Sequence, residues 1–269
     1  MSDFRAGRLA AVRAKIAALE AGGRRDSESL PFGDPRIDAH LPDGGLPLGR
    51  WHEVIGEGLE TETAAAPAAF AALMAAPLAA RGEAVWVLRR DDLHAPGLAS
   101  LGFPPERLIQ VCARDDAEAL AVMEDALASA GVAVVFAEVG AVDLTAGRRL
   151  QLACERGAAT GLVIRRSPFG AGAGKAQGSA AVARWRVAAA PSEPQAGAFG
   201  LGAPRWRVEL EYCRGGRPGA WLFEAPGLYD YAHEEDIDGT HPLRLVAELG
   251  DRQLAPAQPR QVSNSRAAG

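Results

Sequence analysis

Apolar runs of strand length, separated along the chain by segments of helical character, constrain the fold of this sequence most strongly. Residues 84–88 read AVWVL, residues 132–137 read VAVVFA and residues 161–164 read GLVI. A continuous apolar run of this length is typical of a parallel strand that is buried on both faces. Two further strands are expected at 51–55 and 108–112. The alternation therefore predicts an α/β fold, with a mostly parallel sheet covered by helices.

The intervening helices are expected at residues 64–80, 115–130 and 144–158. The first of them is rich in alanine, and a proline in its first turn is compatible with a helix. Pro77, near its end, is expected to stop or kink it. The second helix has acidic residues in its first turn, which is favourable to the helix dipole.

Residues 44–63, GGLPLGRWHEVIGEGLETET, have the order of a phosphate-binding site: a turn, a short strand, a glycine-containing loop and a helix N-terminus. Backbone N–H groups and the helix dipole favour anions at such a place. A working loop reads G-x-x-x-x-G-K-[ST], in which the lysine reaches the β- and γ-phosphates. Counted from Gly56, this chain has Thr61 at the second glycine and Glu62 at the lysine, and only Thr63 fits. A carboxylate there repels ATP, so we expect the shape of a nucleotide site without its chemistry.

Glu138 ends the run 132–137, at the place where a Walker-type strand normally ends in the aspartate that orients Mg²⁺. Because Glu62 is expected to face the same pocket, we interpret Glu138 as a solvated remnant and not as a metal ligand. The predicted degenerate nucleotide site consists of Gly56, Gly58, Thr61, Glu62, Thr63 and Glu138.

Residues 30–56, LPFGDPRIDAHLPDGGLPLGRWHEVIG, resemble the opening of the bacterial RecA recombinase core. The degenerate loop and the later segments RWRV and RWRVELEYCRGGRPGAWLFE resemble the ImuA family more closely, and the resemblance covers residues 30–224. ImuA proteins are the RecA-like members of a bacterial mutagenesis cassette that works in error-prone translesion synthesis. The resemblance implies a RecA-like core, in which an antiparallel extension continues the mostly parallel sheet.

The same resemblance bears on catalysis. In RecA-like ATPases the region after the strand at 84–88 supplies a glutamate that activates water. Here Arg89 and Arg90 occupy its approximate place, with Asp91 close behind as an open alternative. We therefore expect no enzyme activity, no cofactor and no metal.

Beyond residue 166 the sequence changes character. Two glycine-rich stretches, 167–179 and 191–204, lie about where RecA-like proteins carry DNA-binding loops. Residues 161–220 hold nine basic and three acidic side chains, in a chain whose net charge is −5. A basic strip with tryptophans suits single-stranded DNA, through phosphate contacts and base stacking. The alternative is an arginine-rich surface that reflects a GC-rich genome, with the tryptophans in the core. The candidate DNA-binding residues are Lys175, Arg184, Trp185, Arg186, Arg205, Arg207, Arg214 and Arg217.

The expected domain organisation has four parts. Residues 1–23 form an amphipathic helix, residues 24–29 a polar linker, residues 30–224 the RecA-like core, and residues 225–269 a C-terminal extension with a disordered end. Within this extension, residues 242–250 are compatible with a short helix. The helix at 1–23 either packs on its own domain or docks a partner through an apolar stripe of Leu9, Val12, Ile16 and Leu19.

The sequence argues against three other classes of protein: metal-binding, secreted and membrane proteins. The three cysteines are far apart and share no metal-ligand spacing, which indicates reduced thiols in the cytoplasm. The acidic run at residues 233–238, HEEDID, is interpreted as a loop, because consecutive residues cannot all face one ion. No secretory signal or bilayer-spanning apolar run is recognised, so we expect no membrane association.

Three functions compete. The first is a non-catalytic scaffold or accessory protein in the SOS mutagenesis complex of translesion DNA synthesis, which the family resemblance favours. The second is a RecA-like regulator of recombination that binds single-stranded DNA. The third is a cell-division inhibitor similar to SulA. On the first reading, the implied partners are ImuB, which is a relative of Y-family polymerases, an error-prone C-family polymerase, and RecA itself.

Overall fold

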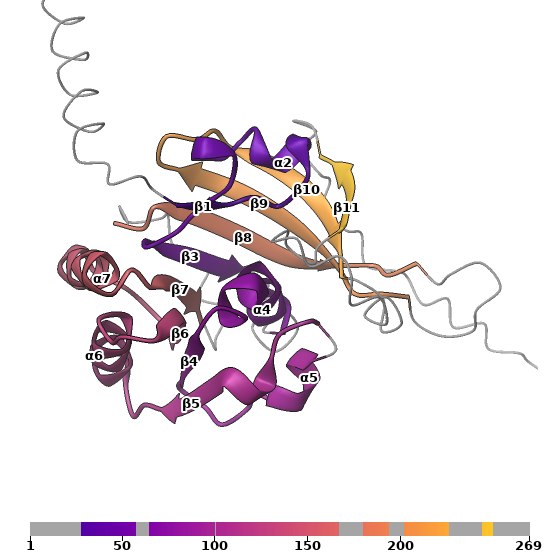
Figure 1. The fold of residues 1–269 in the computed structure, drawn as a ribbon. Coiled ribbons are helices and arrows are strands. Elements are labelled where there is room, and N and C mark those ends of the chain that lie inside the picture. Colours follow the sequence, from indigo (N-terminus) through magenta and orange to yellow (C-terminus); the bar gives the residue numbers. More distant parts are fainter. Residues whose placement is uncertain are drawn as a thin grey trace, which may run out of the picture.

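A nine-stranded mixed sheet forms the centre of the fold (Figure 1). The computed structural model describes residues 28–57, 65–99, 101–166, 180–193, 202–225 and 244–249. The strands lie side by side in the order β11-β10-β9-β8-β3-β7-β6-β4-β5. Their bounds are β3 Trp51–Gly56, β4 Glu83–Leu88, β5 Leu108–Cys112, β6 Val132–Val139, β7 Thr160–Arg165, β8 Ala183–Ala190, β9 Arg205–Cys213, β10 Gly219–Glu224 and β11 Arg244–Glu248.

Six strands, from β8 to β5 in the sheet order, are parallel to one another. This half of the sheet confirms the predicted parallel core, and the five strands expected between residues 51 and 164 all form. The side chains of β4, β6 and β7 are almost all buried, because helices cover both faces of the sheet here.

Helix α4 covers one face of the parallel half, and α6 and α7 cover the other (Figure 1). The last two begin at the predicted places, where the Asp115 carboxylate accepts from the Glu118 N–H and the Asp143 carboxylate from the Ala146 N–H. Helix α4 contains Pro77 and ends two residues after it. The helix bounds are α2 Pro35–Asp38, α4 Ala65–Ala79, α5 Ala95–Ala99, α6 Asp116–Leu127 and α7 Leu144–Gly157, with the 3₁₀ turns η1 Pro42–Gly44 and η2 Pro105–Arg107.

The antiparallel half begins at β9. Strand β8 is parallel to β3 on one side and antiparallel to β9 on the other, and β10 and β11 continue the antiparallel pairing. The short helix expected at 242–250 is wrong, because residues Arg244–Glu248 form strand β11. The segment pairs with the outer side of β10, Leu222 opposite Ala247, and its Leu245 side chain is buried in the core. Pairing with the open edge of β10 satisfies the backbone N–H and C=O groups of this segment, which favours a strand here.

The segment before β3 packs on the same face as α4. It contains the strands β1 Ser29–Leu30 and β2 Leu46–Pro47, which pair with each other, and the short helix α2. The Trp221 indole N–H of β10 donates to the Arg36 carbonyl at 3.1 Å, and the Arg217 N–H donates to the His40 carbonyl at 2.9 Å. These bonds fasten the start of the core to the β9–β10 hairpin.

Some predictions fall on residues that the structure does not describe. They include the N-terminal stripe of Leu9, Val12, Ile16 and Leu19, the glycine-rich stretch 167–179, and the end of the chain beyond residue 249. The domain limits at 23, 29 and 224 stay predictions. Among the described helices, none is long and apolar enough to cross a lipid bilayer.

Candidate functional site at the carboxyl edge of the parallel strands

The carboxyl ends of β3, β7 and β6 meet at one edge of the sheet. Ile55, Arg165 and Val139 lie opposite one another across these three strands. Gly56 and Glu138, two members of the predicted degenerate site, therefore belong to the same edge. In open α/β sheets, this is the edge at which ligands bind. The other predicted members, Gly58, Thr61, Glu62 and Thr63, lie outside the described residues.

Glu138 is buried at the end of β6, with 1% of its surface exposed. The indole N–H of Trp86, on the adjacent strand β4, donates to its Oε1 atom at 3.1 Å. Trp86 in turn stacks on Phe136, two residues before Glu138, with ring centroids 4.2 Å apart. The expectation that Glu138 is solvated is therefore wrong, because the tryptophan on the neighbouring strand covers it.

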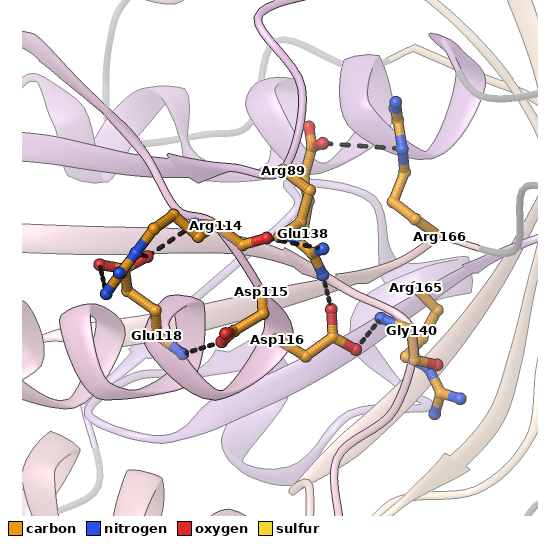
Figure 2. Close-up of polar contacts among 9 residues, drawn as sticks. All are labelled: Arg89, Arg114, Asp115, Asp116, Glu118, Glu138, Gly140, Arg165 and Arg166. Carbon is orange, nitrogen blue, oxygen red and sulfur yellow. Dashed lines mark hydrogen bonds and ion pairs between the residues drawn. The ribbon is translucent and has the colours of Figure 1, made fainter.

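A guanidinium group lies against the other carboxylate oxygen. Nε of Arg166 is 3.6 Å from Oε2 of Glu138, and Nη2 of the same arginine is 2.6 Å from Oδ2 of Asp92 (Figure 2 shows Arg166 and Glu138). Only 12% of the Arg166 side chain is exposed, and its backbone N–H donates to the Val139 carbonyl at 3.0 Å. One arginine thus joins the ends of β7 and β6 to the loop after β4.

A second arginine, Arg89, occupies the region after β4 where RecA-like ATPases supply a water-activating glutamate. Arg89 pairs with Asp116 of α6 and donates to the Arg114 carbonyl at 3.3 Å (Figure 2). The other oxygen of Asp116 accepts from the Gly140 N–H at 2.9 Å. Arg89 therefore ties the end of β4 to the start of α6 and the loop after β6. The alternative base, Asp91, lies exposed in the loop after β4.

The arginines of the candidate DNA-binding set lie mostly in ion pairs. Glu53, on β3 and 1% exposed, accepts from Arg165 at 2.6 Å and from Arg184 at 2.8 Å. Along the same face of the sheet, each further arginine of β8 and β9 has a carboxylate partner. These pairs are Arg186 with Glu211, Arg207 with Glu57, and Arg205 with Glu224 and Glu193.

Pairing with Glu224 and Glu193 raises the pKa of the Arg205 guanidinium. The carboxylates of Glu53, Glu57 and Glu224 come from outside residues 161–220. The positive charge of that sequence segment is therefore offset in space by residues that are distant in sequence.

Trp185 is fully buried between Phe32 and Phe70, with ring centroids 6.0 and 5.9 Å away. Its assignment as a base-stacking residue is wrong, because no face of the indole reaches solvent. Trp206 is also buried, so the alternative interpretation of core tryptophans holds for both. Two members of the set differ from the rest: Arg214 and Arg217 are exposed in the β9–β10 turn and have no ion pair among the described residues. Lys175 lies outside the described residues.

Three residues that organise this region were absent from the predicted site: Glu53, Arg165 and Arg166. A signal for Glu53 exists in the sequence, since it is a carboxylate in the middle of a strand that is otherwise expected to be buried. Such a group requires a charged partner. The partners themselves could not be assigned, because the two arginines come from strands 112 and 131 residues away. Among the described residues, no group of three His, Cys, Asp or Glu side chains is placed to hold a metal.

The sheet order, the flanking helices and the antiparallel extension define a RecA-like protein. The crystal structure of the RadB recombinase has the same fold, with a TM-score of 0.51 and 17% sequence identity, over 72% of this chain and 95% of that one. The sequence matches no protein-family model. It is 54% identical over 246 residues to the protein ImuA of two Caulobacter vibrioides strains, NA1000 and ATCC 19089, which covers 89% of this chain and 98% of theirs. The chain belongs to the ImuA family.

Proposed function

We propose that this chain is a non-catalytic RecA-like accessory protein in error-prone translesion DNA synthesis. Membership of the ImuA family supports a role in this mutagenesis process, and the fold is the one seen in the RadB recombinase. The geometry of the carboxyl edge supports the absence of catalysis.

The observation that carries the proposal is the environment of Glu138. A carboxylate that orients Mg²⁺ has to present its oxygens to the metal and its water ligands. Here one oxygen of Glu138 accepts a bond from Trp86 and the other faces the Arg166 guanidinium at 3.6 Å. A fixed cation in that place disfavours a second cation through like-charge repulsion in a water-poor setting. The residues present do not fit a nucleotide-bound magnesium ion.

The sequence of the glycine-containing loop supports the same conclusion. Glu62 stands where the phosphate-binding lysine belongs, and Thr61 where the second glycine belongs. Replacing a charge-assisted donor by a carboxylate removes one contact and adds repulsion, together worth a few kcal/mol in a partly buried site.

In this proposal the core presents surfaces to other mutagenesis proteins. The proposed partners are an ImuB-like relative of Y-family polymerases and an error-prone C-family polymerase, with RecA as a third candidate. The predicted N-terminal helix and the C-terminal extension are the segments through which a partner would dock.

The test is genetic. Deleting the gene should lower the frequency of damage-induced mutation, and the wild-type chain should restore it. A Thr63→Ala variant, which removes the one residue that fits the phosphate-loop pattern, should restore it equally well. If damage-induced mutation stays at its full frequency in the deletion strain, the proposed role in error-prone translesion synthesis is contradicted. If the Thr63→Ala variant fails to restore mutation although its protein level is normal, the proposed absence of catalysis is contradicted.

A further inference from the structure

The Arg166 guanidinium lies where two carboxylates from separate elements converge. Glu138 approaches from the end of β6, and Asp92 from the loop after β4. The two acids differ in exposure, since the Glu138 side chain is 2% exposed and that of Asp92 is 47% exposed. Arg166 therefore links a buried charge in the core to a charge at the surface.

Two carboxylates around one position would repel each other without a cation between them. A divalent ion or a guanidinium can supply the positive charge, and a guanidinium can also donate several hydrogen bonds in a fixed plane. In this chain the cation is covalently part of the protein. It is further fixed by its own backbone, because the Arg166 N–H donates to the Val139 carbonyl at 3.0 Å.

We propose that Arg166 is a built-in counter-cation, which holds the ends of β4, β6 and β7 together in the way that a bound divalent ion would. This inference rests on the proposed function, because it explains why the edge needs neither metal nor nucleotide to keep its shape.

The proposal predicts a specific consequence of removing the arginine. Arg166→Ala removes the guanidinium that lies 3.6 Å from the buried Glu138 carboxylate, so the midpoint of thermal unfolding should fall by roughly 5–15 °C. The position between Glu138 and Asp92 is then open to a metal. Mg²⁺ or Mn²⁺ alone should raise the unfolding midpoint of Arg166→Ala and leave that of the wild-type chain unchanged.

The experiment is thermal unfolding of the full-length chain, with and without Mg²⁺ or Mn²⁺ and with no nucleotide present. Arg156→Ala is the matched control, because this arginine of α7 is exposed and its contact with Glu124 is long, at 3.9 Å. Its unfolding midpoint should stay near that of the wild-type chain in all buffers. The double variant Arg166→Ala/Glu138→Gln should be more stable than Arg166→Ala and should lose the response to metal, because the buried charge is gone.

Three outcomes would overturn the proposal. The first is an unfolding midpoint of Arg166→Ala equal to that of the control. The second is an equal shift of the midpoint by metal in the wild type and in Arg166→Ala. The third is a double variant whose midpoint shift is the sum of the shifts of Arg166→Ala and Glu138→Gln. If Arg166→Ala does not fold, a folded double variant supports the proposal and an unfolded one contradicts it. Because no nucleotide is used, MgATP binding by the wild-type chain would overturn the proposed function and leave this result standing.

Discussion

Glu53 and Arg184 lie directly opposite each other on β3 and β8, and the arginine Nε donates to the carboxylate at 2.8 Å. They are 131 residues apart in the sequence. Arg165, from the strand on the other side of β3, donates to the second oxygen of the same carboxylate at 2.6 Å. A single buried acid thus joins three adjacent parallel strands. Its negative charge also offsets the positive charge of Arg184, which the sequence alone suggests for DNA binding.

Replacing Glu53 by glutamine should destabilise the protein strongly. The amide keeps the shape of the side chain but leaves two arginines around a neutral group, and breaking a buried ion pair in this way costs about 3–5 kcal/mol. The free energy of unfolding from urea denaturation measures the effect. The matched control is Glu211→Gln, whose ion pair with Arg186 is partly exposed, and which should cost about 1 kcal/mol. Equal losses in the two variants would show that the burial of Glu53 is irrelevant.

The turn arginines should contribute more to any DNA binding than the strand arginines. Arg214 and Arg217 are exposed, whereas Arg184 and Arg186 are held by carboxylates. We expect weak binding of single-stranded DNA that falls steeply between low and physiological salt, as phosphate contacts require. Fluorescence anisotropy measures the affinity for single-stranded DNA, which the double variant Arg214→Ala/Arg217→Ala should lower. The variant Lys175→Ala tests a candidate residue that the structure does not describe. Affinity unchanged in both variants would exclude Arg214, Arg217 and Lys175 as DNA-binding residues.

Stability should fall as the pH drops below 6.5, because of His52. Burial lowers the pKa of this histidine from 6.5 to about 4, and its Nε2 atom bonds to the Pro47 carbonyl at 2.8 Å. The unfolded chain therefore takes up the proton first, so the stability that neutral His52 provides is complete above pH 6.5 and is lost as the pH falls towards 4. Between pH 7 and 5 the loss from this group is about 2 kcal/mol.

The measurement is urea unfolding of wild type and His52→Gln at both pH values. The glutamine variant is expected to be less stable at pH 7 but to show a smaller decrease at pH 5. His94→Gln serves as the control, since His94 is exposed and its replacement should leave the pH dependence unchanged. A pH dependence in His52→Gln as steep as that of the wild type would assign the effect to other groups.

Restoring the lysine of the phosphate loop should not create an ATPase. In Glu62→Lys the ammonium returns, but Thr61 still replaces a glycine, and Arg89 still occupies the region of the catalytic glutamate in a bond network with Asp116. Phosphate release from MgATP should stay at background. Turnover in this single variant would show that the rest of the site is intact.

The sequence predicted the fold well because parallel strands are marked by continuous apolar runs such as 132–137, and the second helix by acidic residues in its first turn. The site was harder to predict. The burial of Glu138 depends on Trp86, 52 residues earlier, and the charge balance of Arg184 depends on Glu53. Strand β11 carries no clear period of its own, and it forms because the edge of β10 is available for pairing.

We propose that this chain works without nucleotide, and isothermal titration calorimetry with MgATP measures whether it binds one. A bacterial RecA protein provides the positive control under the same buffer conditions. We expect no saturable heat from the wild-type chain, because Glu62 replaces the phosphate-binding lysine and Arg166 faces Glu138. A saturable isotherm of micromolar affinity and one site per chain would contradict the account.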